Sequence, residues 1–347
     1  ESVAGSKELK RSIAKLCEWF WVHNESGAEG LITQLVPYLL LTALDEGRHD
    51  SDVKRLYSVR DSLLLLDYED PSIQTIQGLL LRCFIDSTFL KVAEGRRFLS
   101  FVFNLHQGLH PLVMGVMKPQ LGTGNQAVSE AYGDILYRAW RDTDASGQQD
   151  DIRGSIEDAL QDLAHSALHA AEKKFFRSLR TVLNSFHANK ASKGVDGMLL
   201  RIYGPILWRS LRSAHPGVRA QAAQVFFDAF PLQGDERMGA VETDQLLQKQ
   251  FDLLTGLLKD GDHRVRAVAA LGVCRVLREF WEVIPPATTH QILSYVVGTL
   301  GVDAACASVR ASVVNGMCEL LNNPLAHPVL TGLLPTLSNL LCDYSER

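Results

Sequence analysis

Apolar residues recur at helical spacing along most of the chain, and the clearest run begins at Val265. From that residue, apolar or small side chains follow at offsets of 3, 4, 7, 8, 11, 12, 15 and 16, which places them on one stripe of a helix. The run ends before Pro285-Pro286, a pair that cannot continue a helix. No stretch alternates apolar and polar residues with period two between turn signals. The pattern therefore predicts an all-α fold.

The same stripe begins again at Val218 and Val309, and each of the three opening valines is followed by Arg. The intervals between the valines are 47 and 44 residues. Apolar helices are predicted just before the second and third stripes and after the third, over residues 246–258, 292–300 and 330–341. A period in the forties with two helices per unit is typical of HEAT or armadillo arrays. We therefore expect an elongated, curved α-solenoid of HEAT repeats, built from antiparallel helix pairs.

The arginines of the Val-Arg pairs lie in the first turn of their helices: Arg219, Arg266 and Arg310. A cation in that position opposes the helix dipole by about 0.3–1 kcal/mol, so a compensating acid is expected nearby. Asp260 or Asp262, and Asp303, lie in the turns that precede two of these helices. The spacing predicts a structural ladder of ion pairs between adjacent turns of the array.

The two parts of the chain differ in the regularity of this pattern. Residues 1–150 read as degenerate HEAT-like helical repeats or as a separate helical cap, with loops at 122–124 and 142–149. Residues 151–347 read as regular HEAT repeats. When the repeats are aligned so that Asp343 matches Asp260, Arg347 matches Arg264, which directly precedes a Val-Arg pair. We expect the repeats to continue beyond this fragment.

Composition and charge exclude several classes of protein. With 46% hydrophobic and 22% charged residues among 347, the chain is not a disordered polypeptide. The net charge of −5 gives no global basic field, and no apolar run approaches the roughly 20 residues that cross a bilayer. The 6 cysteines are scattered without a CxxC pair, and three lie in apolar helical patterns (Cys274, Cys318 and Cys342). We expect buried, reduced thiols and a cytosolic or nuclear protein without membrane association.

No constellation of residues for catalysis is present. The HExxH, P-loop, GxSxG and dinucleotide-binding motifs are all missing. His165 and His169 lie four residues apart, as two metal ligands on one helix would, but no Cys or Glu joins them at suitable spacing. We therefore expect no enzyme, no cofactor and no metal.

Charge is segregated along the chain. Residues 142–162 carry seven acids and one base, a net charge of −6, whereas residues 172–228 carry ten bases and three acids, a net charge of +7. Lys173, Arg177 and Arg180 share one helical face, which suits a phosphate backbone but also suits a solvated face paired with the acidic stretch. The candidate DNA contacts are Lys173, Lys174, Arg177, Arg180, Lys190, Lys193, Arg201, Arg209 and Arg212.

Several short segments, in order along the chain, resemble one known family. They are AEGRRFLS at 93–100, YGPILWR at 203–209, AFP at 229–231, QKQF at 248–251, LGVC at 271–274, WE at 281–282 and PP at 285–286. Together they resemble the G-type HEAT-repeat subunits of condensin II, which are non-SMC condensin subunits, and the match runs from about residue 55 to the end. The chain would be an N-terminal part of such a subunit.

The resemblance implies a non-catalytic scaffold in the nucleus and on chromosomes. Subunits of this family bind a kleisin chain and double-stranded DNA, act with the SMC ATPase pair and the D-type HEAT subunit, and support mitotic chromosome condensation and segregation. Regulators of the microcephalin type would dock by short peptide motifs. On the repeats, we expect the kleisin groove to include Gln221, Gln224, Arg275 and Arg278.

Two other interpretations remain open. The first is a HEAT adaptor of the transport-receptor or phosphatase-scaffold type, which recognises peptides without binding DNA. The second is an α-helical enzyme, which the missing motifs disfavour. DNA binding by residues 172–228 would separate the condensin interpretation from the adaptor.

Overall fold

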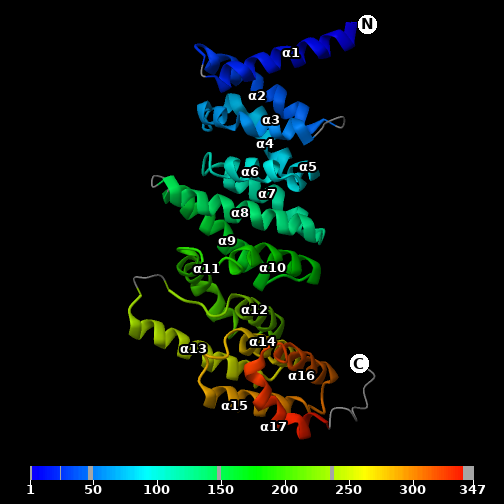
Figure 1. Cartoon of the computed structure of the whole chain (residues 1–347), viewed down its shortest axis with the longest axis vertical. Helices are drawn as coiled ribbons and strands as arrows, with labels where there is room; N and C mark the ends of the chain where they lie inside the picture. The colour runs from blue at the N-terminus through cyan, green and yellow to red at the C-terminus, as the bar shows by residue number, and fades with distance from the viewer. Residues whose placement is uncertain (1, 24, 46–49, 147–149, 235–237, 339–347) are drawn as a thin grey trace. The chain divides into compact units, whose positions relative to one another are not determined.

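A computed structural model describes residues 2–23, 25–45, 50–146, 150–234 and 238–338 (Figure 1). The described residues contain helices and turns and no strand, as the hydrophobic pattern predicts. Within each compact unit, helices pair with their neighbours along the chain, which confirms an all-α solenoid of HEAT repeats.

The helices divide between two compact units. The first unit comprises residues 1–163 and 171–186, and the second comprises 164–170 and 187–347. The first contains α1 (Ser2–Val22), α2 (Ala28–Leu44), α3 (Asp50–Ser58), α4 (Gln74–Ile85), α5 (Ser87–Lys91), α6 (Ala93–Phe103), α7 (Leu109–Gly122), α8 (Gln126–Ser146), most of α9 (Asp150–Leu168) and α10 (Lys173–His187). This division follows the contacts within each unit, whereas the expected boundary at 150/151 concerned the regularity of the repeats.

The second unit contains three helix pairs, and the sequence pattern located every helix in them except α11. The pairs are α11 (Val195–Ser210) with α12 (Pro216–Ala229), α13 (Ala240–Leu258) with α14 (His263–Glu279), and α15 (Pro286–Tyr295), extended by a π-helical turn at Val296–Leu300, with α16 (Ala307–Leu320). A further helix, α17 (His327–Ser338), follows. Short 3-10 turns lie at Arg60–Leu65, Pro71–Ile73 and Pro324–Ala326.

The helices that open with Val-Arg pack on one another in succession. α12 contacts α14, and α14 contacts α16. Gly272 and Gly316 each stand seven residues after the opening valine of their helix. A Cβ at Gly272 would lie 2.2 Å from the Phe227 ring, and one at Gly316 would lie 2.8 Å from the Cys274 sulfur. These positions lack a side chain because the preceding helix fills the space.

Two expectations about local structure are wrong. Residues 142–146 belong to α8 rather than to a loop, while 147–149 lie outside the described residues. Thr143 explains the extension, because it is buried and its hydroxyl donates to the carbonyl of Trp140 one turn earlier. Among the cysteines, Cys274 is buried as expected, but Cys318 is exposed, and Cys342 lies outside the described residues.

Candidate partner and nucleic-acid surfaces

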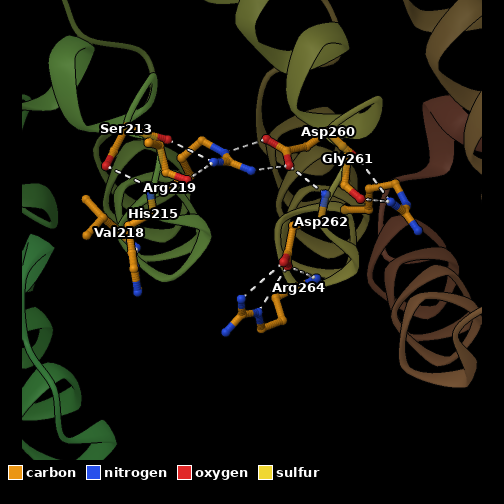
Figure 2. Close-up of polar contacts among 10 residues, drawn as sticks. Ser213, His215, Val218, Arg219, Asp260, Gly261, Asp262 and Arg264 are labelled. Carbon is orange, nitrogen blue, oxygen red and sulfur yellow. Dashed lines mark hydrogen bonds and ion pairs between the residues drawn. The ribbon is translucent and has the colours of Figure 1, made fainter.

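Arg219, in the first turn of α12, joins two successive repeats (Figure 2). Its Nε and Nη2 donate to the two carboxylate oxygens of Asp260, each at 2.8 Å. Its Nη1 donates to the carbonyls of Ser213 and Ala214 in the turn before its own helix, at 2.8 and 3.1 Å. The bidentate geometry gives this contact direction as well as charge.

Arg266, in α14, repeats this arrangement one unit further along the chain. Its Nη1 donates to the carbonyls of Asp260 and Gly261 at 2.9 and 3.1 Å, and its Nη2 donates to a carboxylate oxygen of Asp303 at 3.0 Å. Arg310, which is buried, donates from Nη1 to the Asp303 carbonyl at 2.7 Å. Each arginine thus bonds to carbonyls of its own preceding turn, and the first two also reach the aspartate of the next repeat.

This pairing differs by one repeat from the pairing that the sequence suggested. Charge compensation was expected from an acid in the turn before each helix, whereas Arg219 and Arg266 pair with the acid that follows. Backbone carbonyls of the preceding turn accept hydrogen bonds from the same guanidinium groups. The amides of Asp262 and of Ala305 also donate to Asp260 and Asp303, so both carboxylates are held in place from two sides. We call Arg219, Asp260, Arg266 and Asp303 the interrepeat ladder.

The surroundings of the ladder carboxylates keep them ionised. Burial alone would raise the pKa of Asp260, but hydrogen bonds from Arg219 and from the Asp262 amide hold the pKa below its usual value. Asp303 behaves in the same way: burial acts to raise its pKa, and hydrogen bonds from Arg266 and the Ala305 amide outweigh that effect. The neighbouring Asp262 caps α14, and its hydrogen bond from Arg264 is the largest cause that lowers its pKa, to about 2.

We expect Arg219→Ala to destabilise the second unit by about 1–3 kcal/mol, because it removes the cation from a half-buried carboxylate and the hydrogen-bond donor from two carbonyls. A double-mutant cycle with Asp260→Asn, measured by urea unfolding, should show coupling above about 0.5 kcal/mol. Additive effects would contradict the ladder.

The pH dependence of the cycle follows from the lowered pKa of Asp260. The pKa of an Asp in an unfolded chain is about 3.9. The pairing therefore contributes its full stabilisation above about pH 5, and this stabilisation is lost as pH falls through the lowered pKa of folded Asp260. The coupling between Arg219 and Asp260 should therefore fade on acidification. Arg264→Ala, which removes an exposed arginine from Asp262, is the matched control with a smaller expected effect.

The residues proposed for a kleisin groove are engaged within the second unit. The Gln221 side chain donates to the carbonyl of Ala170 at 2.6 Å. Arg275 lies 3.4 Å from Glu319 of α16, and Arg278 also donates to Glu319. A shallow cavity of about 480 Å³ lies beside these pairs and is lined by Leu271, Arg275, Asn315, Cys318, Glu319 and Asn322. The surface is therefore a polar strip between α14 and α16, and Gln224, on α12, is half-buried outside this lining.

The basic face of α10 lies in the first unit. Lys173, Lys174 and Arg177 are exposed, and among the described residues none of their charged groups has an acidic partner. Arg180 is half-buried, with its guanidinium 5.5 Å from the centre of the Phe176 ring. Three free cations close together on one helix make this face the strongest candidate for contact with phosphates.

The remaining DNA candidates belong to the second unit and serve different purposes. The prediction that Lys190 contacts DNA is wrong, because its ammonium group is engaged within the chain. It donates to the carbonyl of Ala229 at 2.8 Å and to that of Pro231, and it lies 3.5 Å from Asp196, so it stabilises the end of α12. Lys193 and Arg201 are exposed, and Arg201 has interactions within the chain. Arg209 and Arg212 are exposed and line a cavity.

That cavity brings together two pairs that the sequence treated separately. His165 and His169, whose ring centroids are 4.6 Å apart, line it together with Arg209 and Arg212. Partial burial lowers the pKa of His169, and the charge of His165 lowers it further. The histidine spacing was visible in the sequence, but the partner was sought among Cys and Glu rather than among arginines some forty residues away.

The described part of the chain contains no group of three or more His, Cys, Asp or Glu side chains that could hold a metal ion. None of its helices is long and apolar enough to cross a membrane.

Comparison with known proteins shows what the chain is similar to. Residues 82–234, which include α10 and the cavity, match the family model of the condensin II non structural maintenance of chromosomes subunit. The chain is 35% identical over 338 residues to condensin-2 complex subunit G2 of Xenopus laevis, and 36% identical over 343 and 344 residues to those of Mus musculus and Homo sapiens. Over the region that it spans, the chain is homologous to condensin II G2 subunits.

The match to G2 subunits covers 97–98% of this chain. It covers only 29–30% of the length of these relatives, so the chain spans less than a third of a G2 subunit. Among solved structures, an engineered protein from a structural genomics consortium aligns with this chain at 13% identity and a TM-score of 0.30. The alignment covers 98% of this chain and 91% of the engineered protein, but the TM-score is too low to bear on function.

Proposed function

We propose that this chain is part of a non-catalytic condensin II scaffold that binds double-stranded DNA and the kleisin subunit, and thereby supports mitotic chromosome condensation and segregation. One observation carries the DNA part. Lys173, Lys174 and Arg177 project from α10 without acidic partners among the described residues, in a chain whose net charge is −5. Cations held free on one helix face in an otherwise acidic protein favour a polyanionic partner.

Salt dependence tests the DNA interface. Neutralising Lys173, Lys174 and Arg177 to Gln should weaken binding to duplexes by about the same factor whatever their sequence. It should also lower the slope of log K against log salt by about 0.9 for each phosphate that the variant no longer neutralises. Fluorescence anisotropy over a salt series measures both quantities.

A matched triple variant separates local contact from net charge. Arg82→Gln, Lys91→Gln and Arg97→Gln remove the same charge from exposed positions of the first unit, on α4, α5 and α6. The α10 variant should reduce the salt slope strongly and the control should reduce it little. Equal reductions, or no reduction in either variant, would contradict a DNA interface on α10 and favour a peptide-binding adaptor.

The kleisin part rests on the similarity to G2 subunits and on the polar strip between α14 and α16. An extended chain that orders on binding suits a surface formed by successive repeats better than a closed pocket. Arg275, Arg278 and Glu319 there form a charged cluster that a partner could re-pair. Co-purification with the central kleisin segment, followed by mass determination in solution, should give a one-to-one complex. A folded chain that forms no complex would contradict kleisin binding by these repeats.

The proposal places the chain in the nucleus and on chromosomes, with the SMC ATPase pair, the D-type HEAT subunit and regulators of the microcephalin type as further members of the assembly. The observation that supports this is the G2 match over 97–98% of the chain.

A further inference from the structure

The second unit contains a cavity of about 590 Å³ between the end of α9, the end of α11 and the start of α12. Small-molecule sites usually occupy about 300–1,000 Å³, so the cavity has the size of a ligand site. Its lining consists of His165, His169, Pro205, Ile206, Arg209, Ser210, Arg212, Ser213 and Val218.

The charge of this lining has one sign. Two arginines supply the charge, and the lining also contains two histidines but no Asp or Glu. The guanidinium groups of Arg209 and Arg212 have no hydrogen-bond or ion-pair partner among the residues that the structure describes. Both side chains are exposed, so they are free to turn toward a bound anion. Arginine binds phosphate through two parallel N–H donors, which makes a neighbouring pair well suited to phosphate groups.

The shape of the cavity selects among anions. Pro205, Ile206 and Val218 form apolar walls beside the cations, and this partial enclosure strengthens a charge interaction relative to an open surface. A DNA duplex presents its phosphates on a convex surface and cannot enter a cavity of this size. A short chain of phosphate groups is compact enough to enter and carries enough charge to engage both arginines.

We propose that this cavity binds a compact polyphosphate anion, held mainly by Arg209 and Arg212, and that it acts separately from the DNA face of α10. Ser210 and Ser213 add hydroxyl groups to the lining, and the two histidines add hydrogen-bond donors. The proposal does not depend on the scaffold function, because it concerns a different ligand and a different unit of the chain.

Isothermal titration calorimetry with inorganic tripolyphosphate and with orthophosphate, at fixed ionic strength and without divalent cations, tests the proposal on the 347-residue chain. Tripolyphosphate should bind with one-to-one stoichiometry and more tightly than orthophosphate. Arg209→Gln with Arg212→Gln should reduce the affinity for tripolyphosphate by at least about tenfold. The matched control, Arg82→Gln with Arg97→Gln, removes the same charge from exposed positions of the first unit and should change that affinity by much less.

A second variant tests the cavity rather than the charge. Ile206→Trp fills the space and leaves both arginines in place, so it should also weaken tripolyphosphate binding, with circular dichroism as the check on folding. Equal affinity for orthophosphate, equal weakening in the charge variant and its control, or no effect of Ile206→Trp in a folded chain would overturn the proposal. Weaker duplex binding with unchanged tripolyphosphate binding in the Arg209/Arg212 variant would also overturn it and assign these arginines to DNA.

Discussion

Replacing Phe226 with Ala is expected to destabilise the second unit by about 3–5 kcal/mol. Phe226 lies in α12 and is fully buried. Its ring is 6.2 Å from that of Trp208 on the paired helix α11, and 5.6 and 5.9 Å from those of Phe227 and Phe230. Phe230 in turn meets Phe280 at 5.5 Å. Removing the central ring leaves a cavity that helices fixed on several sides cannot close.

The measurement must follow the second unit alone, because the chain has two compact units and its overall unfolding need not be two-state. Hydrogen exchange of the α11 and α12 amides under native conditions reports local stability directly. Leu325→Ala, at a residue that is 52% exposed, is the control and should change the free energy of exchange by less than about 0.5 kcal/mol. A destabilisation by Phe226→Ala well below the expected range, and no larger than that of the control, would show that the aromatic cluster does not hold this repeat together.

Adding a single methyl group at Gly95 is expected to destabilise the first unit by at least about 1–3 kcal/mol. A Cβ at this position in α6 would lie 2.4 Å from the backbone oxygen of Phe89 and 2.7 Å from its Cα. Phe89 is fully buried in α5, so its backbone cannot move aside without disturbing the core. Glycine is needed here for close approach of two helices, since its φ is not in the left-handed region.

Gly78 is the matched control for Gly95. It also lies inside a helix of the first unit, α4, but a Cβ there would meet nothing within 4 Å. Gly78→Ala should therefore stabilise the unit by up to about 1 kcal/mol, because Ala is the better helix former. Opposite signs for the two substitutions, measured by hydrogen exchange of α4 and α6, are the expected result. Stabilisation by both would show that α5 and α6 do not approach closely in solution.

Several features of the fold follow from local pattern. The spacing of apolar residues located α12, α14 and α16 with only small differences at most ends, because a buried stripe with a 3.6-residue period specifies a helix without reference to its partners. The Val-Arg pairs marked the start of each of these helices for the same reason. The helices α1, α5, α7 and α11 were not anticipated. Of these, α1 leaves Leu9, Ile13 and Leu16 exposed, and α5 has only five residues.

Contacts between repeats depend on which turns lie side by side, and the sequence pattern carries no such information. The sequence has acids in the turns before α14 and before α16, and only the stacking of α12 on α14 brings Arg219 to Asp260. In the sequence, Lys190 is one of ten bases in a charged segment, and only the fold brings the carbonyls at the end of α12 to its ammonium group. His165, His169, Arg209 and Arg212 form one cavity for the same reason: helix periodicity orders residues on a single helix, whereas packing brings together residues far apart in the chain.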